Sequence, residues 1–314
     1  MTTAAPIAEP GAAIGYALRP ALFRRLFAGS AGPVLVVCLA ILALWYVGAV
    51  LLNAPFAREI LARSGQPYST ADLVSATLYA ERPVLPAPHQ VAAEIYKTTV
   101  LVKPSSKRSL VFHGWVTLSS TLLGFLMGTA LGIALAVAIV HSRTLDRSLM
   151  PWLVASQTIP ILAIAPMIIV ILGSQGYTGL VPKAIISTYL SFFPVAVGMV
   201  KGLRSPDPIH LDLLRTYNAS RTQAFWKLRW PSAVPFLFTS MKVAIAASLV
   251  GAVVGELPTG ASAGLGARLL AGSYYGQTVQ IWAALLAAAL LAGVLVGIVG
   301  LLHRLVVRRM GMAA

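Results

Sequence analysis

Few residues of this chain have the types and spacings that catalysis requires. The five histidines are scattered over positions 89 to 303, and none forms the H-E-x-x-H pattern that holds zinc beside a catalytic glutamate. Neither G-x-x-x-x-G-K-[ST] nor G-x-G-x-x-G, the glycine patterns that cradle phosphates, occurs. The lone Cys38 excludes an intrachain disulfide. We therefore expect no enzymatic activity, and neither a metal nor a cofactor bound by this chain.

The spacing that carries information lies in a basic segment, RTYNASRTQAFWKLRWPSAVPF, at residues 215–236. Asn218 suits the left-handed conformation that ends a helix. Ser220 and Gln223 form an S-x-x-Q capping box, which begins the next helix. We expect a short helix over residues 212–217 with its acidic residue at the start, a turn, and a second helix over residues 221–230. Such a hairpin fits either an anionic lipid surface or a groove on a cytosolic protein.

The rest of the composition points to a membrane protein, because 58% of the residues are hydrophobic and only 11% are charged. A helix needs about 20 apolar residues to cross a bilayer. Six stretches qualify and predict an all-α polytopic protein with six transmembrane helices. They are residues 33–52, 115–140, 150–173, 182–202, 233–256 and 277–302.

The distribution of positive charge predicts the orientation of these spans. With both termini in the cytoplasm, 14 of the 24 Lys and Arg residues fall on the cytoplasmic side. The short outer loops are nearly free of them, with none at 174–181 and only Arg268 at 257–276; seven more lie in the long external segment 53–114, where length weakens the rule. The net charge of +15 is thus a topology signal and not a nucleic-acid-binding signal.

This topology divides the chain into five regions. We expect a flexible cytoplasmic tail at 1–32, the first span at 33–52, an external segment at 53–114 with interfacial helices near 55–64 and 88–100, a core of five spans at 115–305 that includes a cytoplasmic loop at 203–232, and a cytoplasmic tail at 306–314.

Prolines and polar residues interrupt two neighbouring spans and suggest a path for a solute. Breaks in a membrane helix survive only where other helices or a watery cavity satisfy the freed backbone groups. The alternative is that the polar groups only hold helices together. The candidate path residues are Gln157, Pro160, Pro166, Ser187, Phe193, Pro194 and Glu256.

Small residues recur at every fourth position in three spans, which favours close helix packing. The stripes are Ser120, Gly124, Gly128, Gly132 and Ala136 in the second span; Ala247, Gly251 and Gly255 in the fifth; and Ala289, Gly293 and Gly297 in the sixth.

The basic hairpin also resembles a known motif, the EAA signature of the permease subunits of bacterial ABC importers. Its pattern is E-A-A, three residues, Gly, nine residues, Ile, one residue, Leu-Pro. Here Asp212, Leu213 and Leu214 are at the E-A-A positions, Asn218 is at the Gly position, Leu228 is at the Ile position, and Trp230 and Pro231 are at the Leu-Pro positions. The stretches QTIPILAIAPMII and SAGLGARL also resemble the nitrate, sulfonate and taurine subfamily.

The resemblance implies a type I importer permease in the bacterial inner membrane. It also implies a second permease copy in a homodimer, a cytosolic ABC ATPase dimer that hydrolyses ATP with Mg, and an external binding protein that delivers the solute. The coupling residues that it implies are Asp212, Leu213, Leu214, Arg215, Asn218, Ala219, Ser220, Leu228 and Pro231. The rival class is an ion-coupled transporter or channel, which usually carries intramembrane acids or histidines that the predicted span interiors lack.

Overall fold

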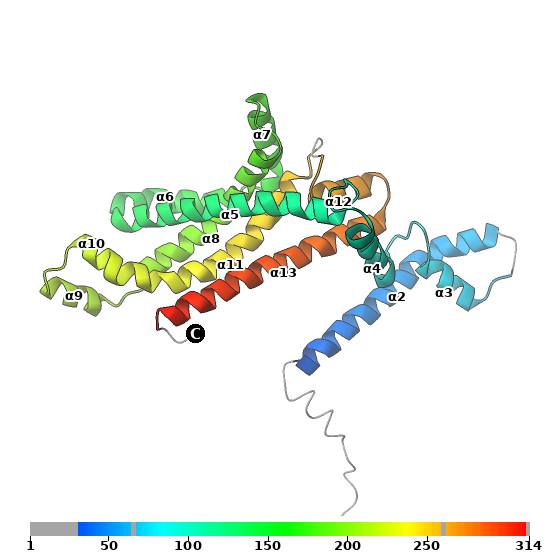
Figure 1. The fold of residues 1–314 in the computed structure, drawn as a ribbon, viewed down its shortest axis with the longest axis horizontal. Coiled ribbons are helices and arrows are strands. Elements are labelled where there is room, and N and C mark those ends of the chain that lie inside the picture. Colours follow the sequence, from blue (N-terminus) through cyan, green and yellow to red (C-terminus); the bar gives the residue numbers. More distant parts are fainter. Residues whose placement is uncertain (1–30, 64–66, 259–261, 312–314) are drawn as a thin grey trace, which may run out of the picture.

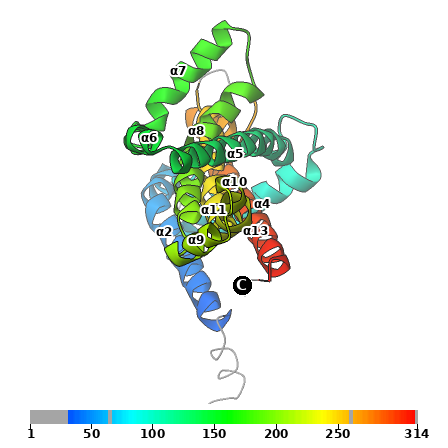
Figure 2. The same cartoon turned by 90° about the vertical axis from the view of Figure 1, so that its left-hand side faces the viewer.

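The computed structural model describes residues 31–63, 67–258 and 262–311, and every regular element in those residues is a helix. The helices form an elongated bundle with α2 diverging from it (Figures 1 and 2). Within the described residues, five helices are long and apolar enough to cross a bilayer. They are α2 (Ala31–Arg63), α5 (Leu110–His141), α8 (Leu180–Leu203), α11 (Trp230–Gly255) and α13 (Thr278–Arg309).

The expected third span is two helices. α6 (Arg143–Ser156) and α7 (Ile161–Ser174) meet at an angle of 98°, so the bundle has six spans only if this bent pair is one of them. The break precedes Pro160, which has no N–H to donate and disfavours a helical conformation at the residue before it. The sequence predicted a break here but not its size, and α7 projects away from the bundle (Figures 1 and 2).

The core of the bundle is α8, which packs between α5 and α11. The glycines of α5 make this close approach possible. A methyl carbon on Gly124 would lie 2.2 Å from the Cβ of Ser187 and 2.7 Å from the carbonyl oxygen of Ala184. On the other side, one on Gly251 would lie 2.7 Å from the Cα of Ser187. The expected packing role of these two stripes is confirmed.

The stripe on α13 behaves differently. Ala289, Gly293 and Gly297 are exposed, and nothing lies within 4 Å of a methyl carbon built on either glycine. The expectation that this stripe packs inside the bundle is therefore wrong for the single chain. Periodicity shows which residues share a face but not which face meets a neighbour.

α2 is longer than the expected span, because it continues through Pro55 to Arg63 and absorbs the separate helix predicted at 55–64. Two side chains fasten its middle to the rest of the chain. Trp45 donates to the carbonyl of Pro86 at 3.0 Å and contacts the ring of Trp282 on α13. The buried Asn53 accepts from the N–H of Val84 at 2.7 Å and donates to the carbonyl of Leu85 at 2.8 Å.

The remaining helices are short. α3 (Thr70–Leu78) begins with a capping box in which hydrogen bonds from Ser69 lower the pKa of Asp72. α4 (Pro88–Tyr96) continues into the π-helical turn η1 (Lys97–Leu101), and this confirms the helix expected at 88–100. The other elements are α9 (Pro208–Thr216), α10 (Arg221–Ala224), the π-helical turn η2 (Phe225–Arg229) and α12 (Leu265–Tyr274).

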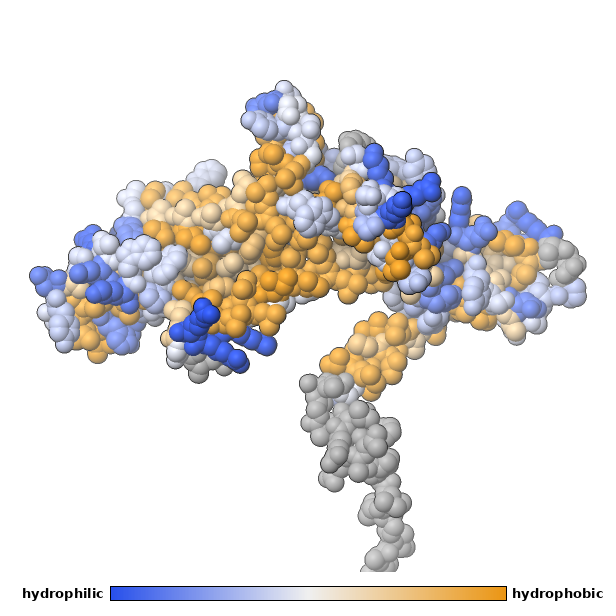
Figure 3. All heavy atoms as spheres, viewed as in Figure 1, coloured by the Kyte–Doolittle hydropathy of each residue, from blue (hydrophilic) through white to orange (hydrophobic). Residues whose placement is uncertain are grey.

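The surface agrees with a membrane-spanning bundle. Apolar side chains cover the middle of the helices, and hydrophilic ones gather at the α9–α10 end and around α3 and α4 (Figure 3). The expected tail at 306–314 is helical up to Arg309. The tail expected at 1–32 lies almost wholly outside the described residues.

Replacing Gly124 by alanine should weaken the bundle, because the added methyl carbon would collide with the backbone of α8. Overpacking of this kind costs roughly 1–3 kcal/mol. Gly114→Ala is the matched control on the same helix, since nothing lies within 4 Å of its methyl carbon. We expect a lower midpoint of thermal unfolding in detergent for Gly124→Ala only. Equal midpoints would contradict the packing described here.

Candidate functional site

The basic segment forms a helical hairpin at one end of the bundle (Figure 1). α9 begins four residues earlier than the sequence indicated, because Asp207 caps it by accepting from the N–H of Ile209 at 2.9 Å and Pro208 occupies the first turn. Asp212 therefore lies inside the helix, where it pairs with Arg215 at 2.8 Å. The prediction that Asp212 starts the helix was wrong.

The turn of the hairpin matches the sequence prediction. Asn218 has a φ of +54°, the only positive φ of a non-glycine residue in the described part of the chain. Ser220 accepts from the N–H of Gln223 at 3.2 Å, and its own N–H donates to the Gln223 side chain at 2.8 Å. The capping box is thus complete and fixes the start of α10.

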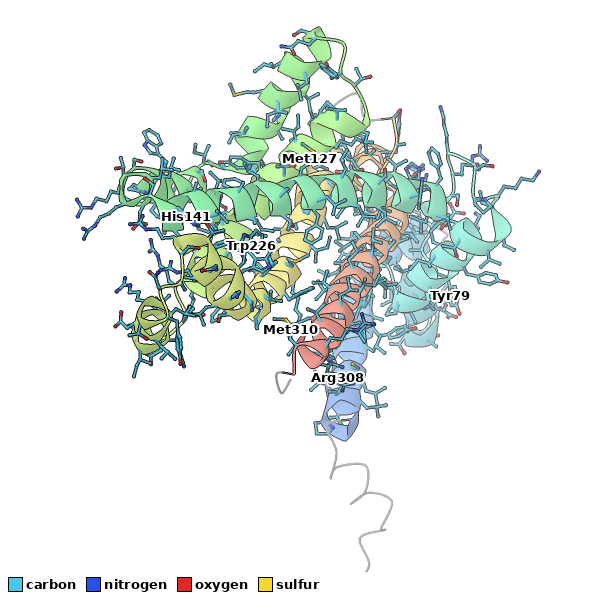
Figure 4. All side chains as sticks on the ribbon, turned by 60° about the vertical axis from the view of Figure 1, so that its left-hand side comes forward. Tyr79, Met127, His141, Trp226, Arg308 and Met310 are labelled. Atoms are coloured by element: carbon cyan, nitrogen blue, oxygen red, sulfur yellow. The ribbon has the colours of Figure 1, made fainter. Side chains whose placement is uncertain are left out.

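The second arm of the hairpin runs into the membrane without a break. α10, η2 and α11 are consecutive, and the π-helical turn η2 comes directly before Pro231, which has no N–H to donate to the preceding turn. Phe225 is buried and contacts the ring of His141 at the end of α5, while Trp226 is exposed (Figure 4). The hairpin is therefore rigidly joined to α11 and packed on α5.

α9 has two apolar faces with different surroundings. Leu211 and Leu214 line a cavity of about 310 Å³ between the hairpin and the end of α5. Ile209, Leu213 and Tyr217 point the other way, with 68%, 53% and 77% of their surfaces exposed. Their spacing of four residues places them on one side of the helix. α9 thus offers an apolar stripe, residues 209, 213 and 217, to a partner outside the chain.

The expected path residues are not gathered in one cavity. Gln157 and Pro160 are exposed at the break between α6 and α7, and Pro166 is exposed on α7. Ser187 is fully buried where α5, α8 and α11 cross, and its hydroxyl has no hydrogen-bond partner. Phe193 and Pro194 are half-buried on α8. Their role in a path stays a prediction.

Glu256, the seventh of these residues, is fully buried at the end of α11. Thr117 donates to its carboxylate at 2.9 Å, and the N–H of Gly266 donates to it at 3.0 Å. The ammonium of Lys183 lies 3.6 Å away and donates to the carbonyl of Ala263 at 2.9 Å. A buried carboxylate is stable only with such partners. In this conformation Glu256 joins α5, α8, α11 and α12 and meets no solvent.

Sequence reasoning missed the partners of Glu256. Thr117 also accepts from the N–H of Leu265 at 2.8 Å, and His113 accepts from the N–H of Gly264 at 3.0 Å. The signal was available, since a lysine and a glutamate at the outer ends of two apolar spans each need a partner. His113 itself lies inside α5, which begins five residues before the expected span.

The segment after Glu256 also contains a sequence pattern that is found in serine hydrolases. Residues 260–264 spell G-x-S-x-G, the nucleophile pattern of serine hydrolases, with Ser262 at its centre. A triad needs a histidine free to bond the serine. Both ring nitrogens of His113 have backbone partners, the N–H of Gly264 and the carbonyl of Lys107. His113 is therefore not free to act as the histidine of a triad with Ser262, and the pattern itself was missed in the sequence analysis.

Replacing Gly264 by alanine should break the network. Its φ is +127°, and a methyl carbon would lie 2.1 Å from the carboxyl carbon of Glu256. Gly276→Ala is the control for a milder positive φ, because its φ is +63° and its methyl carbon meets nothing within 4 Å, whereas Gly264 has φ +127° and ψ 162°, a region almost restricted to glycine. We expect a clearly larger fall in the thermal unfolding midpoint for Gly264→Ala. A fall of equal size in both variants would contradict the special demands of both contact and backbone at Gly264.

Comparison with known proteins identifies a family. Residues 128–312 match the family described as "Binding-protein-dependent transport system inner membrane component". The chain is 38% identical to the riboflavin transport system permease protein of Chloroflexus aurantiacus, over 72% of this chain and 80% of that protein. It is 32% identical to the formylaminopyrimidine transport permease protein of Halalkalibacterium halodurans, over 62% and 72% of the two chains.

Two further similarities complete the picture. The chain is 26% identical to the nitrate import permease protein of a Synechocystis species, over 69% of this chain and 76% of that protein. Its fold is similar to that of a chain in an inward-facing structure of the MetNI methionine ABC transporter, with a TM-score of 0.52 at 21% identity over 64% and 95% of the two chains.

The helical bundle, the apolar spans and these relatives agree with one another. The rival class, an ion-coupled transporter or channel, finds no support among them. The chain belongs to the family of inner membrane components of binding-protein-dependent transport systems, and it is the multi-pass permease subunit of a bacterial ABC importer that works with an ATPase subunit and a substrate-binding protein.

Proposed function

We propose that the hairpin formed by α9 and α10 couples this permease to its ATPase. In this mechanism α9 lies in a groove of the cytosolic ATPase subunit, which binds and hydrolyses ATP with Mg. Closure of the ATPase dimer moves the hairpin, and the spans switch between inward- and outward-facing states. The solute passes when the outer side is open to the binding protein.

The observation that carries this proposal is the exposed apolar stripe of α9. Ile209, Leu213 and Tyr217 are largely exposed on a segment that the charge pattern places in the cytoplasm. Helices with one apolar face outward commonly dock into a hydrophobic groove on a partner. The EAA-like residues support the same reading, because Asp212 and Leu213 lie on the exposed part of α9.

The alternative, a lipid surface as the target of the hairpin, is less well supported. The basic residues suit an anionic lipid, but Arg215 is paired with Asp212 on α9 itself. The stripe also lies on the first arm of the hairpin, apart from the aromatic residues Phe225 and Trp230, which lie on the second arm in contact with each other. A groove on a protein can cover the apolar stripe and can also offer a polar partner to Asp212.

Tyr217→Asp should uncouple the ATPase. A charge at the end of the apolar stripe would have to be desolvated in the contact, so we expect loss of ATPase co-purification and of solute-stimulated ATP hydrolysis. Tyr275→Asp is the matched control at a similarly exposed tyrosine at the end of α12, 72% exposed against 77% for Tyr217. Co-purification and hydrolysis assays on the reconstituted complex decide the matter. Normal coupling in Tyr217→Asp would remove the proposed role.

We also propose that two copies of this permease form the pore as a homodimer. Support comes from α7, which leaves the bundle with Leu162, Met167 and Val170 more than 60% exposed. Just before α7, the side chain of the exposed Gln157 bonds, among the described residues, only to the neighbouring Ser156, in a segment where lipid offers no hydrogen bonds. A second copy, with a watery path between the two, would cover the apolar residues and hydrate the polar ones.

Cysteine labelling tests the path. In a Cys38→Ser background, Gln157→Cys should react with a small water-soluble thiol reagent in at least one nucleotide state of the complex. Ala165→Cys is the matched control on the same bent pair, because Ala165 is only 1% exposed and should not react. If Gln157→Cys stays unlabelled in every state, this part of the chain does not line a watery path.

A further inference from the structure

A second cavity lies at the opposite end of the spans from the hairpin. It measures about 670 Å³, within the range of small-molecule sites. The beginnings of α5 and α8, the end of α7 and residues 258, 262 and 263 after α11 line it. It is lined by residues 115, 116 and 119 of α5, 169 and 173 of α7, 177–183 except 181, and 255, 258, 262 and 263. By the charge pattern this end faces outward, where a binding protein would release solute.

The lining combines aromatic rings with hydroxyl groups. Trp115 and Tyr177 line it from different segments, and their side chains are 67% and 53% exposed. Ser119, Thr178 and Ser262 add hydroxyls that both donate and accept hydrogen bonds. Rings of this kind bind flat aromatic molecules by stacking, and hydroxyls bind their polar edges.

The one positive charge in the lining of the cavity is neutralised by a buried carboxylate. Lys183 is the one charged residue among the lining residues, and its ammonium is held by Glu256 at 3.6 Å and by the carbonyl of Ala263 at 2.9 Å. A small inorganic anion would need a cation that is not already neutralised. The cavity therefore offers little to nitrate and more to an uncharged solute.

We propose that this cavity is a solute site on the outer side of the path and that it takes a planar, uncharged heteroaromatic molecule with hydrogen-bonding edges. The inference rests on the proposed function of the chain as half of the pore. The relatives support this class of solute. Those named for the heteroaromatic molecules riboflavin and formylaminopyrimidine are 38% and 32% identical to this chain, whereas the one named for nitrate is 26% identical. The buried network fixes one wall, since Ala263 both lines the cavity and holds Lys183.

Binding to the assembled permease–ATPase complex in nanodiscs tests the proposal. The probe is riboflavin, whose fluorescence falls when its ring stacks on an indole; unlabelled formylaminopyrimidine and sodium nitrate are the competitors. We expect saturable quenching that nitrate does not reverse. Trp115→Ala should weaken binding about tenfold or more, and Trp115→Phe should retain most of it because a ring remains. Trp152→Ala is the matched control, a 75% exposed tryptophan on α6 outside the cavity lining.

The outcomes separate this inference from the proposed function. No saturable quenching by riboflavin together with no binding of formylaminopyrimidine in equilibrium dialysis would overturn it. So would displacement by nitrate, or equal loss of binding in Trp115→Ala and Trp152→Ala. In each case, normal ATPase co-purification and its loss in Tyr217→Asp would leave the coupling role intact. If riboflavin binds as expected but Tyr217→Asp couples normally to the ATPase, the solute site stands and the coupling role of the hairpin is removed.

Discussion

The close approach of α8 to α5 and α11 is the contact on which the rest of the structure depends. Apolar helices gain little from the hydrophobic effect inside a bilayer, so van der Waals packing and interhelical hydrogen bonds must hold them. Gly124 and Gly251 bring the two neighbouring helices against Ser187 of α8 from opposite sides. The hydroxyl of Thr188 donates to the carbonyl of Gly124 at 3.2 Å, and that of Ser248 donates to the carbonyl of Thr121 at 2.8 Å. These contacts make the three helices one rigid unit.

α11 connects the two candidate sites of that unit. It starts in the hairpin, through η2 and Pro231, and ends at the buried Glu256. A helix of 26 residues is about 39 Å long at 1.5 Å per residue, which is enough to cross the membrane. A force applied to the hairpin therefore reaches the wall of the outer cavity through a single continuous helix. Glu256 and Lys183 tie that wall to the ends of α11 and α8.

Much of the hairpin could be predicted from the sequence because its signals are local. Asn218 and the Ser220–Gln223 capping box act on residues three or four positions away, so their geometry needs no knowledge of the remaining fold. The start of α9 was predicted wrongly because two acidic residues could begin the helix. Asp207, followed by Pro208, caps α9, and Asp212 lies inside the helix. The G-x-S-x-G run shows the converse, since a matching pattern has no meaning until its neighbours are placed.

By itself, the sequence determined the membrane class, the approximate spans, the hairpin and the family resemblance, because hydropathy, charge bias and caps depend on residues near one another in the chain. Only the tertiary structure decided the 98° bend at α6 and α7, the exposed stripe of α13, and the burial of Glu256 with Thr117 and Lys183. Those features join residues far apart in sequence; Thr117 and Glu256 are separated by 139 positions. Which helix face meets which neighbour is settled by packing, and no local pattern contains that information.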